Sequence, residues 1–329
     1  MQFSSAPREE KYFAPRRLGH TNLWSTDIER SMHFYRDVCG LTLEFSEPDL
    51  KAHFLGTGHT PHDLGMIEVT GGVDRYGRDG LLQIPGTVGL KPGLNHLAWE
   101  LENEAHLIAV FREMEDAGVK YDMTVDHQVA HSLYMFDPDG NYNEFYCDTV
   151  KNWREVLQGD MDLLTSAWDP LTAEGFEEGR YDPDPELRVV ESAAVQPKRL
   201  THAVLVTSQL DSMVNYYTTI GGLRVVNKDG GAVYLSAGLP GYNYVLILIE
   251  GEATAYHHAS FELQGDADVE RSFLRLSERD IKPVRVVELP WKRSFFLRDP
   301  DGMLSEWYVN KPGMRDLTAR GDVPLEYAV

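Results

Sequence analysis

The chain has 329 residues, of which 42% are hydrophobic and 25% are charged, proportions typical of a globular protein with about two domains. Its formal net charge at pH 7 is −21. Because phosphate binding depends on clustered Lys and Arg, this charge argues against nucleic acid as a partner. No stretch approaches the roughly 18 consecutive apolar residues of a membrane helix, so a membrane is excluded as well. MQFSSAPREEKYFAPRR, at the N-terminus, lacks the apolar segment of a secretory signal, and we expect a cytoplasmic protein.

The first predicted elements form a βαβββ unit that starts at residue 18. LGHTNLW alternates like a strand. STDIERSMHFYRDVCG then offers Ser25 and Thr26 as N-cap candidates, apolar residues at helical spacing and a terminating Gly40, so it predicts a helix. Three short strands follow, LTLEFSE, KAHFLG and LGMIEVT.

The same order restarts after Pro92 and Gly93. A strand, LNHLAWEL, precedes a predicted helix, EAHLIAVFREMEDAG. Further strands are expected near residues 121–125, 131–136 and 142–147. A strongly acidic segment with four prolines comes next, which favours irregular structure over much of its length.

An internal repeat relates the two halves of the chain. LNHLAWEL and MFDPDGNYNEFY resemble YHHASFEL and FLRDPDGMLSEWY, and the offset from His96 to His258 equals that from Glu144 to Glu306, 162 residues. LGHTNLW resembles LTHAVLV at a larger offset of 182, so 20 extra residues enter the first copy between positions 41 and 94.

The repeat predicts an α+β protein built from four βαβββ units in two tandem domains. The expected organisation is an N-terminal arm (1–15), a catalytic metal-binding domain (16–148), an acidic linker (149–198), a second domain (199–310) and a C-terminal tail (311–329).

His20, His96 and Glu144 are the candidate metal ligands. The two histidines sit early in the first strands of the first two units, and the glutamate sits in the last strand of the second. Strand pairing between two units would bring them to one concave face. Two imidazoles and one carboxylate form the facial triad of non-haem Fe(II) sites, which leaves about three coordination positions open, and Mn(II) accepts the same ligands.

Paired βαβββ units with these three residues resemble the vicinal oxygen chelate superfamily, which includes glyoxalase I, bleomycin-resistance proteins and extradiol dioxygenases. VDHQVAHSLYMFDPDGNYNE (125–144) further resembles the signature of the type I extradiol ring-cleaving (catechol 2,3-) dioxygenases. The signature positions are filled, in order, by Val125, His127, Leu133, Tyr134, Asp137, Pro138, Gly140 and Glu144. This resemblance implies that a catechol reacts with O2 next to its diol to give a muconic-semialdehyde-type product.

The resemblance also implies roles for residues around the metal. Asn22, in His-Thr-Asn, would lie beside the oxygen and substrate positions. His62 would be the acid/base that takes a proton from the catechol, with His59 as the alternative. His127 and Tyr134 would hydrogen-bond the substrate oxygens. The family also implies a homo-oligomer.

The second half repeats the ligand types as His202, His258 and Glu306 but changes their surroundings. By the repeat alignment, Val204, Tyr242 and Phe296 replace Asn22, His62 and Tyr134, and no histidine stands opposite His127. We therefore expect a second domain without catalytic function, although its triad could still bind a metal ion. Relatives usually have their active site in the C-terminal half, so this chain departs from the common arrangement.

The substrate is expected to be an uncharged catechol. Similar enzymes that act on homoprotocatechuate carry an Arg a few residues before the signature histidine, whereas this chain has Asp122 there. Two alternative functions are a glyoxalase-type isomerase or lyase and a ligand-sequestering binding protein of the same superfamily. The former usually takes a second glutamate ligand, and position 20 is a histidine here.

Overall fold

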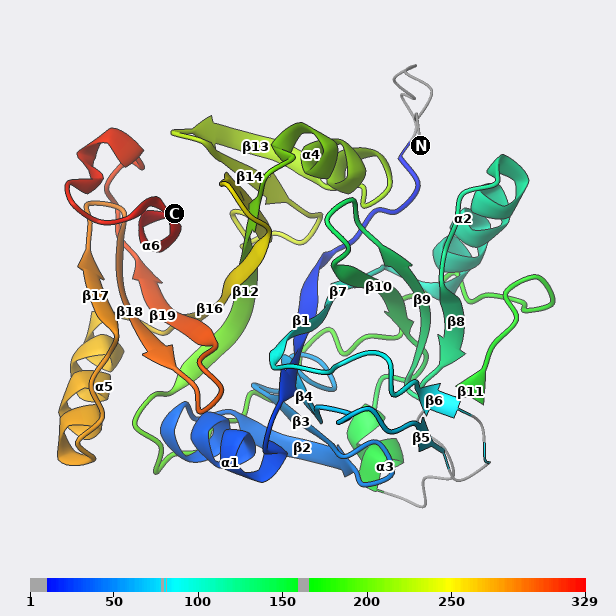
Figure 1. Cartoon of the computed structure of the whole chain (residues 1–329), viewed down its shortest axis with the longest axis horizontal. Coiled ribbons are helices and arrows are strands. Elements are labelled where there is room, and N and C mark those ends of the chain that lie inside the picture. Colours follow the sequence, from blue (N-terminus) through cyan, green and yellow to red (C-terminus); the bar gives the residue numbers. More distant parts are fainter. Residues whose placement is uncertain (1–10, 78–79, 81, 159–165) are drawn as a thin grey trace.

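The computed structural model describes residues 11–77, 80, 82–158 and 166–329, which form two halves that lie side by side (Figure 1). The first half contains two βαβββ units. Their elements are β1 (Arg17–Ser25), α1 (Ile28–His33), β2 (Thr42–Glu47), β3 (Ala52–Gly56) and β4 (Leu64–Glu68), then β7 (Gly93–Glu100), α2 (Glu104–Ala117), β8 (Met123–Asp126), β9 (Ala130–Phe136) and β10 (Tyr142–Asp148).

The second half repeats this order. Its elements are β12 (Pro197–Thr207), α4 (Leu210–Thr219), β13 (Arg224–Asp229), β14 (Ala232–Ser236) and β15 (Leu246–Glu250), then β16 (Ala255–Leu263), α5 (Asp266–Glu278), β17 (Arg285–Glu288), β18 (Lys292–Arg298) and β19 (Leu304–Asn310). The predicted α+β fold with four βαβββ units is therefore confirmed.

Each half folds around one mixed sheet. In the first sheet the order is β11-β8-β9-β10-β7-β1-β4-β3-β2, and in the second it is β13-β14-β15-β12-β16-β19-β18-β17. The first strands of the two units, β1 and β7, pair antiparallel at the centre, as do β12 and β16. Each first strand also pairs in parallel with the last strand of its own unit. The first strands of all four units are thus central.

The remaining elements are short. The extra residues of the first half form β5 (Arg75–Tyr76) and β6 (Leu82–Ile84) in the connection between β4 and β7, within the range where the repeat predicts an insertion. The acidic segment contains α3 (Trp153–Gln158) and β11 (Ser166–Ala167), and β11 extends the first sheet beside β8. A 3₁₀ turn (Leu317–Arg320) and α6 (Leu325–Ala328) follow β19. No helix in the described part of the chain is long and apolar enough to cross a membrane.

The N-cap of α1 differs from the prediction. Asp27 caps the helix, and its side chain accepts a hydrogen bond from the backbone N–H of Arg30. Ser25 and Thr26 instead donate their hydroxyls to Asp301 of the second half. The two hydroxyls are therefore used for a contact between the halves, which the local sequence pattern does not reveal.

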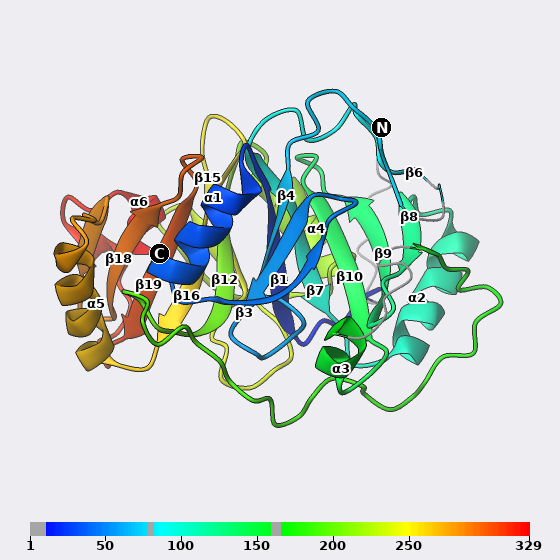
Figure 2. The same cartoon turned by 90° about the horizontal axis from the view of Figure 1, so that it is seen from below.

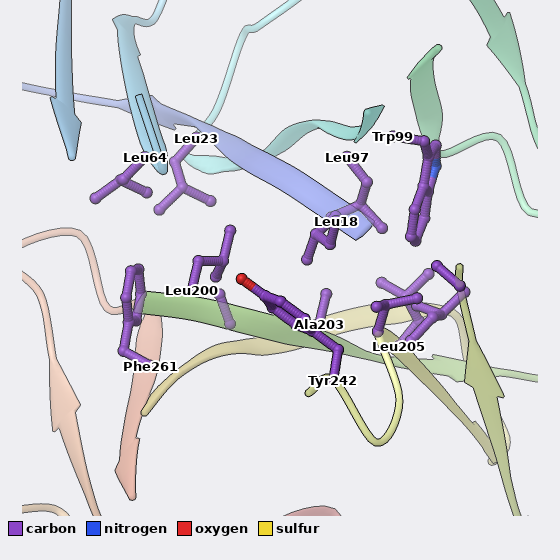
Figure 3. Close-up of a cluster of buried hydrophobic side chains, with 14 of the residues drawn as sticks. Leu18, Leu23, Leu64, Leu97, Trp99, Leu200, Ala203, Leu205, Tyr242 and Phe261 are labelled. Carbon is purple, nitrogen blue, oxygen red and sulfur yellow. The ribbon is translucent and has the colours of Figure 1, made fainter. Parts of the chain in front are cut away.

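The two halves share one hydrophobic core. Leu18, Leu23, Leu64, Leu97 and Trp99 of the first sheet face Leu200, Ala203, Leu205 and Phe261 of the second sheet and Tyr242 of the loop between β14 and β15 (Figure 3). Successive side chains of a strand point to opposite faces, so Leu97 faces this core while its neighbour His96 points away from it. Each candidate triad thus lies on the face of its sheet that is turned away from the other half.

Two equivalent hydrogen bonds connect each half to the Asp-Pro-Asp-Gly turn of the other. Tyr35, after α1, donates to Asp299 Oδ2 (3.1 Å), and Tyr217 of α4 donates to Asp137 Oδ2 (2.9 Å). Figure 2 shows α1 beside the strands of the second half, and Figure 1 shows α4 next to the turn between β9 and β10 of the first. The Tyr217 hydroxyl also lies 3.1 Å from Oδ1 of Asn143, the neighbour of Glu144.

Replacing Tyr217 by phenylalanine is expected to lower the free energy of unfolding by about 1–3 kcal/mol, because a buried carboxylate loses a hydrogen-bond donor. Denaturation with urea, followed by tryptophan fluorescence, measures the change. Tyr76→Phe is the control, since the Tyr76 side chain is 53% exposed. Equal unfolding midpoints for the two variants would contradict the importance of this contact.

His131 attaches the acidic segment to the first sheet. Its ring stacks on Trp168 at 4.4 Å, and its Nδ1 lies 2.5 Å from Oε1 of the buried Glu104. Burial acts to lower the pKa of His131, but its hydrogen bonds to Asp126 and Glu104 outweigh burial and raise the pKa above its usual value. The folded state therefore favours the protonated imidazole.

This shift predicts that stability depends on pH. A group whose pKa is raised on folding stabilises the protein below its unfolded pKa of ~6.5, and this contribution is lost as the pH rises through the folded value. His131→Gln should therefore lower the thermal midpoint more at pH 6 than at pH 9. The exposed His33→Gln provides the control at both pH values. A larger loss at pH 9 would contradict the assignment.

Candidate active site

The strand register brings His20, His96 and Glu144 together. His20 on β1 and Glu144 on β10 both pair with Ala98 of β7, which lies between them. The methyl side chain of Ala98 leaves space over the central strand. His96 lies two residues before Ala98 and therefore on the same face. All three predicted ligands are buried.

The distances within this triad fit a single metal ion. The Nε2 atoms of His20 and His96 lie 3.2 Å apart, and they lie 2.9 and 3.1 Å from Oε2 of Glu144. Three ligands bound at right angles, each about 2.1 Å from one ion, are about 3 Å apart. Asn95 Oδ1 lies 2.6 Å from His96 Nδ1 and can only accept, so Nδ1 carries the proton and the Nε2 lone pair faces the triad.

The charge states of the triad also suit a cation. Burial acts to raise the pKa of Glu144, but His20 and His96 outweigh this effect and hold it well below its usual range. Burial lowers the pKa of His20, although Glu144 acts in the opposite direction. An ionised carboxylate beside a neutral imidazole is the protonation state that metal binding requires.

A cavity of about 130 Å³ adjoins the triad. Its lining includes every residue predicted for the site, namely His20, Asn22, His62, His96, His127, Tyr134 and Glu144. Both ring nitrogens of His62 and Oδ1 of Asn22 are buried without a hydrogen-bond partner among the described residues. Buried polar atoms without partners are costly, so these side chains are suited to a polar ligand in the cavity.

His62 is held in the turn that precedes β4. Its neighbour Asp63 accepts hydrogen bonds from the backbone N–H and hydroxyl of Thr57 (2.6 and 2.8 Å), which closes the loop between β3 and β4. The His62 ring lies against that of His20 (3.9 Å) and meets Phe54 edge-on (4.8 Å). Burial lowers the pKa of His62 well below its usual value, so the imidazole is neutral.

His59 occupies a different position. Its Nδ1 lies 3.0 Å from the hydroxyl of Thr57, and its backbone oxygen accepts a hydrogen bond from Arg17 (3.0 Å). Of the two histidines, His62 lines the cavity and His59 does not.

Asn22, His127 and Tyr134 complete the polar part of the cavity. A Cβ at Gly65 would lie 2.0 Å from Oδ1 of Asn22, so glycine at this position leaves room for the amide. The Tyr134 hydroxyl lies 2.9 Å from Nε2 of His127. Burial and the nearby Glu144 raise the pKa of Tyr134 well above its usual value, so the phenol keeps its proton and can donate it in a hydrogen bond.

Other residues of the site were not identified from the sequence. Ser132 donates to Oε1 of Glu144 (2.5 Å), which leaves Oε2 to face both imidazoles. Ser132 precedes Tyr134 by two residues, so strand alternation could have placed it on the same face. Tyr146 lines the cavity beside His20, and a Cβ at Gly19 would lie 2.0 Å from its hydroxyl. The alternation of β10 could likewise have indicated Tyr146.

The second triad has the same residues in a wider arrangement. Nε2 of His202 and Nε2 of His258 lie 3.9 and 3.6 Å from Oε2 of Glu306. Val204 and Phe296, which replace Asn22 and Tyr134, are buried in an apolar cluster with residues of α6. Burial acts to raise the pKa of Glu306, but Lys292 and the imidazoles outweigh it and hold the pKa well below its usual range.

A family model described as the Glyoxalase/Bleomycin resistance protein/Dioxygenase superfamily matches residues 17–145 and 199–306. Biphenyl-2,3-diol 1,2-dioxygenase 3 of Rhodococcus globerulus is 29% identical over 171 residues, 50% of this chain and 83% of the relative. Catechol-2,3-dioxygenase of Bacillus subtilis (strain 168) is 26% identical over 234 residues, 69% of this chain and 72% of the relative.

Solved structures share the fold at lower identity. Homoprotocatechuate 2,3-dioxygenase from Arthrobacter globiformis superposes with a TM-score of 0.64 at 17% identity, over 97% of this chain and 92% of that one. The Mn(II)-bound glyoxalase from Novosphingobium aromaticivorans gives 0.63 at 14% identity, over 95% and 90%. Proteins named as a dioxygenase and as a glyoxalase thus share this architecture, so the fold alone does not determine the reaction.

Proposed function

The chain belongs to the Glyoxalase/Bleomycin resistance protein/Dioxygenase superfamily, and on this premise we propose that it is an extradiol dioxygenase with its active site in the first half. The reaction inserts both atoms of O2 into a catechol next to the diol and opens the ring. Fe(II) or Mn(II) would be held by His20, His96 and Glu144. The relatives named as catechol and biphenyl-diol dioxygenases support this reaction class.

The observation that carries the proposal is the setting of the first triad. His62, His127, Tyr134 and Asn22 line one cavity beside the three candidate ligands, whereas the second half has Val204 and Phe296 in place of Asn22 and Tyr134 and no histidine opposite His127. A glyoxalase-type reaction would need the ligands, but it gives no reason for these four polar groups.

Each of these side chains has a chemical role in the proposal. The bound metal would supply Lewis acidity and bring catechol and O2 together. His62, as a neutral imidazole without a hydrogen-bond partner among the described residues, takes the proton that the diol loses on binding. The Tyr134 phenol and His127 donate hydrogen bonds to the substrate oxygens as negative charge develops. Asn22 orients the small ligand beside His20.

The substrate in this proposal is an uncharged, apolar-substituted catechol. Phe45 and Phe54 stack at 4.4 Å on one side of the cavity, and Leu50 and Ile67 extend this wall. Among the described residues, neither Lys nor Arg lines the cavity. Asp122, near the signature, instead accepts a hydrogen bond from the Tyr142 hydroxyl (2.6 Å).

Alkyl-, aryl- or chloro-catechols should therefore have a higher kcat/KM than catechols with a carboxylate, by at least about tenfold, or roughly 1.4 kcal/mol. Burying an unpaired carboxylate against an apolar wall explains the direction. Steady-state kinetics on matched pairs of substrates measure the ratio. A preference of the same size for the carboxylated member would overturn this choice of substrate.

Reconstitution tests the reaction itself. The protein is loaded with Fe(II) or Mn(II) without oxygen and then mixed with air and a panel of monocyclic and bicyclic catechols. A yellow ring-fission product with oxygen uptake supports the proposal. Absence of colour and of oxygen uptake across the panel would reject it, and isomerisation of a hemithioacetal without oxygen uptake would favour the glyoxalase-type function. A metal-free protein whose function survives Glu144→Ala would favour a binding protein.

A further inference from the structure

Lys292 stands beside the second triad, at a position where the first half has alanine. Residue 292 follows residue 130 by the repeat offset of 162, and Ala130 lines the cavity of the first half. Lys292 lies on β18, where alternation puts it on the same face as Ser294 and Phe296, and Phe296 pairs with Glu306. Although it is a lysine, it is only 1% exposed.

The ammonium group of Lys292 is bound on two sides. It donates to Oε1 of Glu306 (2.6 Å) and to the backbone oxygen of Val329. Ser260 donates to the other carboxylate oxygen of Glu306 (2.8 Å). Both oxygens of Glu306 are thus engaged, whereas in the first half Ser132 binds one oxygen of Glu144 and the other faces the imidazoles.

The imidazoles of the second triad are nevertheless prepared to bind a cation. The Thr201 hydroxyl donates to the backbone oxygen of Ser260 (2.9 Å), so it accepts from Nδ1 of His202 (2.9 Å). The lone pair of His202 therefore lies on Nε2. Nε2 of His202 and Nε2 of His258 have no hydrogen-bond partner among the described residues. The ligand atoms are present, and the Lys292 ammonium is bound to the carboxylate of one of them, Glu306.

The segment after β19 closes this side of the second sheet. α6 and Val329 pack with Val204 and Phe296, the residues that replace Asn22 and Tyr134. Trp291, next to Lys292, donates to the backbone oxygen of Ala328 (3.2 Å). In the second half, apolar side chains and Lys292 therefore occupy the region that corresponds to the cavity of the first half.

We propose that Lys292 serves as a tethered cation in place of a metal ion at the second triad, so that His202, His258 and Glu306 bind a metal only when this ammonium is removed. A divalent ion next to a buried ammonium would be repelled and would compete for the same carboxylate. Instead of binding a metal ion, Glu306 binds Lys292, and Lys292 in turn anchors the segment 325–329 through Val329. The expected count of one ion per wild-type chain rests on the proposed metal at the first triad.

Metal content tests this proposal without an activity assay. Purified variants are incubated with Mn(II), freed of unbound ions by gel filtration, and analysed for metal per chain. Wild type should hold one ion per chain and Glu144→Ala none. Lys292→Ala introduces the alanine that the first half has at the equivalent position, and this variant should hold one ion more than wild type. Lys292→Arg keeps the cation and should equal wild type, and adding His258→Ala to Lys292→Ala should remove the gained ion.

The outcomes separate this proposal from the proposed function. An ion that Glu144→Ala retains and that is lost when His258→Ala is added would lie in the unchanged second triad, and it would overturn the tethered-cation assignment even if lysine variants fail to fold. Equal metal content in wild type and folded Lys292→Ala would also overturn it. If instead wild type holds no ion and Lys292→Ala holds one, the first triad fails as a metal site while the role of Lys292 stands.

Discussion

Replacing Glu144 by glutamine is expected to abolish oxygen consumption and to lower metal affinity by more than about 100-fold, because loss of groups that merely orient ligands already costs ~10–100-fold. Glu144 supplies the negative charge among the candidate ligands, and its Oε2 lies 2.9 and 3.1 Å from the two imidazole nitrogens. Metal analysis and an oxygen electrode measure both effects. Glutamine preserves the side-chain volume, so the change is one of charge and ligand strength.

The repeat supplies a matched control for this variant. Glu306→Gln makes the same substitution in the second half, where the carboxylate pairs with Lys292 (2.6 Å). It should retain metal content and oxygen consumption but lower the stability of the fold, because a buried ammonium loses its counter-ion. Equal loss of activity in the two variants would place the function in both halves, contrary to the proposal.

His62→Phe is expected to lower kcat by about 10²–10⁴-fold, the usual contribution of a general acid or base. KM and metal content should change little, because His62 does not belong to the ligand triad and phenylalanine keeps a ring against Phe54. Steady-state oxygen uptake, together with metal analysis, separates these effects. A loss of metal equal to the loss of activity would show that His62 acts through the ligands instead.

His59→Phe is the control for position and chemistry. His59 lies three residues earlier, and its ring contacts the hydroxyl of Thr57. This variant should keep kcat within about threefold of wild type, well below the effect of a general acid or base. A large loss in His59→Phe with an active His62→Phe would reverse the assignment.

The triad and the fold could be predicted because the chain contains an internal repeat, so its two halves can be compared with each other. The constant offset from His96 to His258 and from Glu144 to Glu306 marks equivalent strands, and strand alternation then sets the face of each ligand. The conformation of the turn that holds His62 and the N-cap of α1 could not be predicted in this way. Asp27 is the cap because α1 begins at Ile28, and the Ser25 hydroxyl instead donates to Asp301, which is far away in the sequence.

Lys292 shows how far the repeat could have been used. The offset of 162 sets it opposite Ala130, and alternation along its strand puts it on the face of Glu306. A lysine at an inward strand position is rare, because burying an ammonium is costly without a partner. The position of Lys292 could therefore have indicated a buried cation that pairs with the carboxylate of Glu306. The contact with Val329 could not, since it depends on the path of the chain after β19.

Oxygen stoichiometry tests the central claim most directly. Wild-type protein loaded with Fe(II) is given a limiting amount of an alkyl-substituted catechol, while dissolved oxygen and the mass of the product are followed. We expect one O2 to be consumed per catechol and a ring-opened product that has gained both oxygen atoms, with no oxygen consumption by Glu144→Gln. Turnover to an isomer of unchanged mass, without loss of oxygen, would contradict it.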